Sequence, residues 1–252
     1  MTHQRYSGSV ALVTGAGCGI GQATVLRLAH EGATVVGCDV DPAGLEATEK
    51  LLSHDGYAAT LLEADVADPA GVARAVAALP GGDIDLLANV AGIMDHFLPV
   101  TDLDDETWER VIAVNLTGPM RLCRAVIPAM RTNAGGAIVN VASIGALTGS
   151  VAGTAYTAAK HGLIGLTRSL AYLYAPDGIR VNAVCPGGVN TGIGRTASVG
   201  SQWAFDRLSP SFTRTVRTAE PDEIAGLIGW LGSAEARNVN GAVITSDGGF
   251  TA

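Results

Sequence analysis

The stretch that decides the fold is Val10-Ala-Leu-Val-Thr-Gly-Ala-Gly-Cys-Gly-Ile-Gly21. Its first five residues form a short apolar run typical of a buried strand, and an amphipathic segment follows the last glycine. Glycines let a backbone turn tightly and allow another group to approach the main chain closely. A helix starting here would direct free N–H groups and its positive dipole end at the turn. The stretch predicts a strand, a phosphate-binding turn and a helix; a purely structural turn is the alternative. The candidate contacts are Gly15, Cys18, Gly19, Ile20 and Gly21.

Short apolar runs and longer amphipathic segments alternate along the rest of the chain. The predicted strands are Val10–Thr14, Thr34–Cys38, Ala58–Leu62, Asp85–Asn89, Ala137–Val141, Ile179–Val184 and Ala242–Thr245. The predicted helices are Ile20–His30, Ala43–Ser53, Pro69–Leu79, Thr107–Met130, Ala155–Tyr174 and Asp222–Leu231. This alternation predicts one α/β domain over residues 1–252, a Rossmann fold with a doubly wound, seven-stranded parallel sheet and helices on both faces. We expect residues 187–217 to form a substrate loop or lid.

Composition narrows the function classes. Of 252 residues, 48% are hydrophobic and only 5% aromatic, which suits a parallel sheet packed closely between helices. A net charge of −8 leaves no basic surplus for nucleic acid or a membrane surface. The four cysteines lack C-x-x-C or metal-ligand spacing, so we expect reduced thiols and no metal site. The polar first seven residues lack the apolar run of a signal peptide, and we expect a cytoplasmic protein.

An acidic residue follows the second predicted strand. Asp39 lies 18 residues beyond Gly21, near the offset of the acid that binds the adenosine ribose in dinucleotide-binding folds. A carboxylate there accepts hydrogen bonds from both ribose hydroxyls of NAD and repels the 2′-phosphate of NADP. No Arg or Lys occurs between Gly32 and Glu49 to hold that phosphate. We therefore expect NAD(H) to be preferred over NADP(H); the alternative is that Asp39 only caps the following turn.

Three residues could share one proton-transfer task. Tyr156 and Lys160 are four apart on a predicted helix and so project from the same face, and Ser143 follows a predicted strand at the carboxyl edge where α/β sheets bind ligands. A free Tyr titrates near ~10, and a neighbouring ammonium would lower that value. Lys and Arg total 16, yet only Lys50 and Lys160 are lysine. Retention of a compact ammonium at position 160 favours a functional role.

With these residues in place, the chain closely resembles the short-chain dehydrogenase/reductase family in its compact form of about 250 residues. The resemblance covers nearly the whole sequence. Its motifs occur together and in order, and they are Thr14-Gly-x3-Gly-Ile-Gly21, Asp65-Val66, Asn89-Val-Ala-Gly92, Asn115, Ser143, Tyr156-x3-Lys160, Pro186-Gly187 and Asp247-Gly-Gly249.

The resemblance implies an NAD(H)-dependent oxidoreductase that interconverts a secondary alcohol and a ketone. Tyr156 would be the acid/base, with Lys160 lowering its pKa, Ser143 holding the carbonyl oxygen and Asn115 in the proton relay. Asp65 and Val66 would bind adenine. The remaining implied cofactor contacts are Asn89, Ala91, Gly92, Tyr156, Lys160, Pro186, Gly187, Val189 and Thr191. Taken alone, Asn115 could be polar surface and Asp65 a helix cap.

The sequence says less about the substrate. Candidate contacts, besides Ser143, are Met94, His96, Val151 and Trp203. Relatives that reduce 3-oxoacyl thioesters typically carry Gln three residues before the tyrosine and Asn immediately before it, where this chain has Gly153 and Ala155. A 3-oxoacyl thioester reductase and a non-catalytic NAD-sensing protein remain the alternatives. A lyase without nucleotide would not need the glycine turn.

Two further expectations concern the helices. Pro119 should bend Thr107–Met130 and could free the carbonyl of Asn115 for the relay water. Small residues at Ala158, Gly162, Gly165 and Ser169 form a stripe that permits close helix packing. The packing partner could be internal, but the resemblance implies a homotetramer, with a dimer as the next choice.

Overall fold

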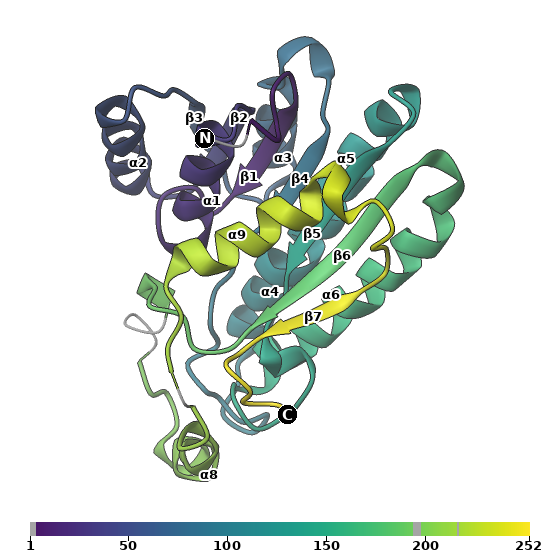
Figure 1. The fold of residues 1–252 in the computed structure, drawn as a ribbon. Helices are drawn as coiled ribbons and strands as arrows, with labels where there is room; N and C mark the ends of the chain where they lie inside the picture. Colours follow the sequence, from purple (N-terminus) through teal and green to yellow (C-terminus); the bar gives the residue numbers. More distant parts are fainter. Residues whose placement is uncertain (1–3, 194–197, 216) are drawn as a thin grey trace.

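A parallel sheet of seven strands forms the centre of the molecule in the order β3-β2-β1-β4-β5-β6-β7 (Figure 1). The computed structural model describes residues 4–193, 198–215 and 217–252. The strands are β1 (Val10–Thr14), β2 (Thr34–Asp39), β3 (Thr60–Glu63), β4 (Leu86–Asn89), β5 (Gly136–Val141), β6 (Ile179–Pro186) and β7 (Val243–Ser246). All neighbouring pairs are parallel. The predicted seven-stranded Rossmann sheet is confirmed.

Helices cover both faces of the sheet, as predicted. In Figure 1, α9 (Pro221–Gly232) crosses one face, next to α1 (Gly19–His30). The opposite face carries α5 (Gly118–Thr132) and α6 (Thr154–Leu173). Consecutive side chains of β1 show why both faces need cover, since Val13 packs into one buried cluster and Leu12 into the other. The remaining α-helices of the described residues are α2 (Pro42–His54), α3 (Pro69–Ala77), α4 (Asp105–Ile112) and α8 (Gln202–Phe212).

The prediction of one bent helix over Thr107–Met130 needs correction. The segment begins earlier, as α4, and passes through a π-helical turn at Ala113–Thr117 before α5. Pro119 lies in the first turn of α5, and it has no N–H to give the carbonyl of Asn115. The break expected at Pro119 is therefore a widened turn that contains Asn115.

The expected loop over residues 187–217 also needs correction, because it contains α8. Phe205, Leu208 and Phe212 are spaced by three and four residues and are half-buried, which is the pattern of an amphipathic helix. Pro210 and the surrounding small polar residues obscured that pattern in the sequence. In Figure 1, α8 lies apart from the sheet, beyond the ends of β6 and β7. Residues 194–197 and 216 of this segment lie outside the described residues.

No helix in residues 4–193, 198–215 or 217–252 combines the length and apolar character needed to cross a lipid bilayer. Over the same residues, no group of three His, Cys, Asp or Glu side chains gathers as metal ligands would. Cys18 is exposed, whereas Cys38, Cys123 and Cys185 are buried, and all four are free thiols.

Candidate active site

The glycine-rich turn is packed too closely for side chains at several of its positions. A Cβ on Gly21 would lie 1.9 Å from the carbonyl oxygen of Gly15, and one on Gly15 would lie 3.1 Å from the backbone of Ala91. Gly15 and Gly19 also adopt positive φ angles of 72° and 54°. The residue that precedes α1, Cys18, makes no side-chain cap to the first helical N–H groups. Those groups face the cleft as a phosphate site requires, and the structure thus fits a dinucleotide here.

Asp39 closes one side of this cleft at the end of β2. Its Oδ2 accepts a hydrogen bond from the N–H of Gly17 at 2.9 Å, and its Oδ1 accepts one from the N–H of Asp41 at 3.0 Å. The carboxylate thus braces the glycine turn and the following turn, and each oxygen retains acceptor capacity. Burial raises the pKa of the Cys18 thiol, and the negative charges of Asp39 and Asp41 raise it further.

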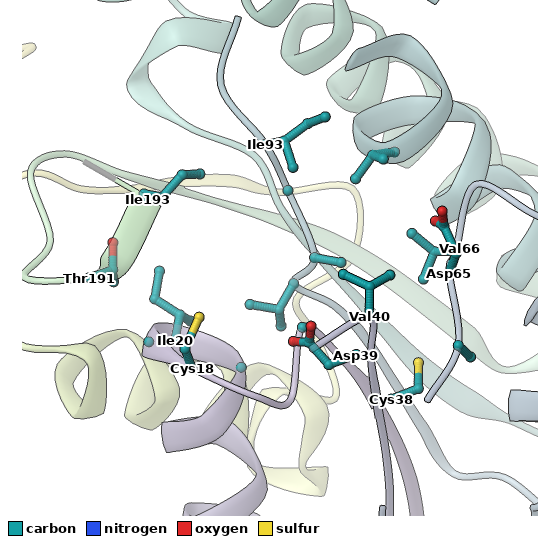
Figure 2. Close-up of a pocket in the computed structure, with 18 of the residues that line it drawn as sticks. Cys18, Ile20, Cys38, Asp39, Val40, Asp65, Val66, Ile93, Thr191 and Ile193 are labelled. Atoms are coloured by element: carbon teal, nitrogen blue, oxygen red, sulfur yellow. The ribbon is translucent and has the colours of Figure 1, made fainter. Parts of the chain in front are cut away.

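Figure 2 shows the cleft with Asp65 and Val66 at one end and Thr191 and Ile193 at the other. The Oδ2 atom of Asp65 pairs with Nη1 of Arg110 at 2.7 Å, and its Oδ1 accepts the N–H of Ala67 at 2.8 Å. Arg110, which was not predicted from the sequence, also lines the cleft. Any adenine contact by Asp65 would share this carboxylate with Arg110.

The motif after β4 divides between the cleft and the core. Ala91 and Gly92 line the cleft, while Thr14 Oγ1 accepts the N–H groups of Val90 at 2.9 Å and Ala91 at 3.0 Å. The side chain of Asn89 instead points into the buried interior, where its Nδ2 donates to Asn140 Oδ1 at 2.8 Å. The predicted cofactor contact by Asn89 therefore has no support from its side-chain position, and the side chain ties β4 to β5.

The segment after β6 crosses toward the cleft. Gly187 packs against Asp247, because a Cβ at 187 would lie 2.9 Å from the Asp247 Cα. Val189 then forms an isolated parallel bridge with Ala219. Thr191 reaches the glycine turn, where a Cβ on Gly19 would lie 3.0 Å from its Cγ2. Of the predicted residues in this segment, Thr191 lines the cleft, whereas Pro186 is buried at the end of β6.

Tyr156, Lys160 and Ser143 meet at the first turns of α6. The Nζ of Lys160 lies 5.5 Å from the centroid of the Tyr156 ring. Burial raises the pKa of Tyr156 to about 12, although a hydrogen bond with Ser143 acts in the opposite direction. Burial lowers the pKa of Lys160 to about 8. The three predicted residues are thus brought together, but the predicted lowering of the Tyr156 pKa by Lys160 is not seen, because burial raises that pKa and Lys160 is not among the groups that shift it.

Lys160 and Asn115 are fixed by the main chain around them. Lys160 Nζ donates to the carbonyl of Val141 at 2.8 Å. Asn115 makes a two-way contact with Ile93, accepting its N–H at 3.1 Å and donating to its carbonyl at 2.9 Å. A Cβ on Gly92 would lie 2.8 Å from Asn115 Oδ1 and 3.4 Å from Lys160 Nζ. Asn115 therefore lies beside Lys160, and its side chain holds the loop after β4 through one donor and one acceptor.

The predicted substrate residues separate into two places. Met94 packs in the apolar cluster around Tyr156, and Val151 lies near Ser143, since a Cβ on Gly145 would contact Ser143, Tyr156 and Val151 at 3.4–3.5 Å. His96 is exposed, and its Nδ1 lies 2.9 Å from Ser198 Oγ. Trp203 is 58% exposed and stacks on Arg207 along an outer groove.

A further residue of the site, Asp95, is not predicted from the sequence. Its side chain is fully buried and accepts the backbone N–H of Tyr156 at 2.9 Å. Nothing in the local pattern Met94-Asp95-His96 points to this contact, because its partner is 61 residues away.

Comparison with known proteins gives consistent matches. A family model described as "Enoyl-(Acyl carrier protein) reductase" matches residues 15–251. The chain is 41% identical to "Short chain dehydrogenase adrF" of Penicillium roqueforti, over 96% of each chain. It is 36% identical to "3beta-hydroxysteroid dehydrogenase 2" of Eggerthella lenta, over 98% of this chain and 96% of that one.

A solved structure of levodione reductase matches with a TM-score of 0.88 and 35% identity, over 97% of this chain and 98% of that one. The resemblance inferred from the motifs is therefore confirmed. This chain belongs to the short-chain dehydrogenase/reductase family of oxidoreductases, which bind a nicotinamide dinucleotide.

Proposed function

We propose that this protein interconverts a secondary alcohol and a ketone, with NAD(H) as its cofactor. The observation that carries the proposal is the group of buried Tyr156 and Lys160 with half-buried Ser143, beside a glycine-lined cleft. The cofactor, when bound, accepts or supplies the hydride. The chain's own residues then have to bind the substrate oxygen and move one proton at that atom.

The roles of the three side chains follow from their environment. Ser143 donates a hydrogen bond to the substrate oxygen, and Tyr156 exchanges a proton with the same atom. A pKa of about 12 keeps the Tyr156 phenol protonated at neutral pH, as ketone reduction requires. Alcohol oxidation needs the phenolate, and the ammonium of Lys160, 5.5 Å from the centroid of the Tyr156 ring, is the positive charge that would favour it. With a pKa of about 8, Lys160 keeps most of its charge at pH 7.

Asp39 supports the choice of NAD over NADP. Its carboxylate lines the cleft at the end of β2, where a ribose hydroxyl could donate to either oxygen. A 2′-phosphate at the same place would face a charge of the same sign. Solved structures with bound NADP also match this chain, so membership of the family does not decide the cofactor. The preference rests on Asp39.

The substrate we propose has an apolar skeleton. Met94 and Ile93 pack around Tyr156, and Val151 lies beside Ser143. One matched relative is named for a 3β-hydroxysteroid, which is a secondary alcohol on an apolar ring system. The matched family model, in contrast, is described by an enoyl thioester reaction. An acyl thioester is thus the second candidate.

A substrate screen tests both candidates and the cofactor together. The purified protein is assayed with NAD and with NADP against cyclic and steroidal secondary alcohols, and with the reduced cofactors against 3-oxoacyl and enoyl thioesters. We expect NAD-dependent oxidation of an apolar secondary alcohol. Preferred turnover of a thioester would select the second candidate. NADH binding without turnover in the whole screen would favour the NAD-sensing alternative.

We further propose a homotetramer, in line with the small-residue stripe on α6. The stripe is divided in the structure. Gly162 packs inside the chain, with Leu116 Cδ2 2.8 Å from a Cβ placed there, whereas Gly165 has open space around its Cβ position. Gly165 and Ser169 are exposed and could pack against a second copy. Light scattering should report a tetramer that Gly165→Leu splits; a monomeric wild type would refute the proposal.

A further inference from the structure

A buried carboxylate caps the helix that carries Tyr156. Asp95 follows β4 and is 0% exposed. Its Oδ1 accepts the N–H of Gly153 at 3.1 Å, and its Oδ2 accepts the N–H of Tyr156 at 2.9 Å. Gly153 is the residue before α6, and Tyr156 is the third residue of the helix. Asp95 thus provides from a separate loop the contact with Tyr156 that a Ser or Asp at position 153 would make, and it also accepts the N–H of residue 153, as a third-residue side chain does in a capping box.

The glycine at 153 is a consequence of this arrangement. A Cβ at that position would lie 2.5 Å from both carboxylate oxygens of Asp95. No side chain fits there while Asp95 is in place. The first turn of α6 contains no acidic residue of its own, so the carboxylate is also the negative charge at this positive helix end. Asp95 and Gly153 form an interlocking pair.

The loop that carries Asp95 makes further contacts with α6. The carbonyl of Leu98 accepts the N–H of Thr154 at 3.0 Å, and the N–H of Leu98 donates to the carbonyl of Asp95 at 3.1 Å. Residues 95–98, which we call the capping loop, therefore satisfy the N–H groups of Gly153, Thr154 and Tyr156. The position of Tyr156 depends on the shape of this loop.

The other side of the capping loop faces the lid. His96 and Phe97 both have left-handed backbones, with φ of 55° and 59°. Such conformations are uncommon for residues other than glycine, least so for His, and persist where surrounding contacts fix them. The fixing contacts come from α8 and the residues before it. The ring of Phe97 lies 5.5 Å from that of Phe205 and 6.2 Å from that of Phe212, and the carbonyl of His96 accepts the N–H of Gly200 at 2.9 Å.

We propose that Asp95 is a positioning residue that holds Tyr156 by capping α6. We also propose that the capping loop couples the position of α8 to the position of Tyr156. Substrate entering beneath α8 would then be sensed at the proton-transfer group through Phe97 and Asp95. This inference rests on the proposed role of Tyr156. It assigns to the capping loop a task distinct from cofactor binding, since none of residues 95–98 lines the glycine-lined cleft.

The first test needs no substrate, because it measures the interlock through thermal stability. Gly153→Ser in the wild type should lower Tm by about 3 °C or more, since its Cβ meets Asp95. In an Asp95→Ala background the same substitution should raise Tm, because the serine has room and caps α6 itself. This reversal of sign is the expected result. A Gly153→Ser effect of the same sign in both backgrounds would overturn the interlock.

The second test separates positioning from general stability. Asp95→Ala should lower kcat at least about tenfold while the Kd for NADH stays within about threefold. Asp68→Ala is the matched control, because Asp68 caps α3 by accepting the N–H of Ala70 at 3.0 Å. It should lower Tm and leave kcat unchanged. Asp95→Ala/Gly153→Ser should recover part of the lost kcat. An unchanged kcat in Asp95→Ala would refute the positioning role.

The third test addresses the link to α8. Phe205→Ala should lower kcat in the wild type and have little further effect in Asp95→Ala, because both changes interrupt one chain of contacts. Additive losses would show that α8 does not act through the capping loop. The Tyr156→Phe variant distinguishes failure of the proposed function from failure of the positioning role of Asp95. If it retains turnover, the proposed function fails; if it is inactive while Asp95→Ala retains its kcat, only this inference fails.

Discussion

The cofactor cleft and the capping loop solve their positioning problems in different ways. The cleft is lined by the backbone of a tightly packed turn, in which side chains at Gly15, Gly19 and Gly21 would meet other parts of the chain. The capping loop works through side chains, because Asp95 reaches α6 and Phe97 reaches α8. A backbone cradle is specified within twelve consecutive residues, whereas the loop depends on partners 61 and 108 residues away. The glycine turn can therefore be predicted from the sequence, whereas the contacts of the capping loop are found only in the structure.

The largest effect should come from the cradle. Gly21→Val should prevent folding or abolish NADH binding, because even a Cβ at 21 would lie 1.9 Å from the carbonyl oxygen of Gly15. Circular dichroism and NADH fluorescence titration measure the two outcomes. Gly149→Ala is the control, since nothing lies within 4 Å of its Cβ position. Normal NADH binding by Gly21→Val would show that the turn tolerates a side chain.

The next effect concerns cofactor choice within the same cleft. We expect Asp39→Ala to reduce the preference for NADH over NADPH at least about tenfold, because it removes the charge that repels the 2′-phosphate. It should also loosen the glycine turn, since the N–H of Gly17 loses its acceptor. Isothermal titration with both reduced cofactors gives the ratio. Equal affinities in the wild type would contradict the role of Asp39.

A stability effect with a defined pH window should appear at Lys160. Its pKa is lowered from 10.5 to about 8 by burial, so the cost of charging it is fully present below pH 8 and disappears as the pH rises toward 10.5. Lys160→Met should therefore raise Tm by a few degrees at pH 7. Loss of the hydrogen bond to the carbonyl of Val141 reduces this gain in Tm. The gain should shrink with rising pH.

Lys50→Met serves as the matched control for that experiment. Lys50 has a side chain that is 73% exposed and pairs with Glu46 on the surface of α2. Its replacement should change Tm by about 1 °C or less at every pH. A Lys160→Met gain that does not vary with pH would mean that burial of the charge is not its source.

The smallest effect should distinguish the two groups of predicted substrate residues. Val151 lies beside Tyr156 and Ser143, so Val151→Ala should raise KM for an apolar substrate by about three- to tenfold. Trp203 lines an outer groove, so Trp203→Ala should leave KM nearly unchanged. Steady-state kinetics with the substrate found by screening give the KM of both variants for comparison with the wild type. A larger effect at Trp203 would place the substrate in the outer groove that Trp203 lines and not beside Tyr156.

The same contrast explains what could be predicted from the sequence. Alternating apolar runs predicted every strand, because a strand covered on both faces needs continuous apolar residues. The grouping of Tyr156 with Lys160 followed from helical spacing. The π-helical turn around Asn115 was only partly foreseen through Pro119, and α8 was hidden by Pro210. Arg110 and Asp95 were missed because each acts on a partner more than 40 residues away, which no local pattern records.

The most direct test of the account compares turnover with cofactor binding in Tyr156→Phe. The phenol oxygen is the only atom removed, and the ring, Lys160 and the cleft all remain. We predict that kcat falls to background while the Kd for NADH stays within about threefold of the wild type. Substantial turnover by Tyr156→Phe, or a loss of NADH binding as large as the loss of turnover, would contradict the separation of proton transfer from cofactor binding.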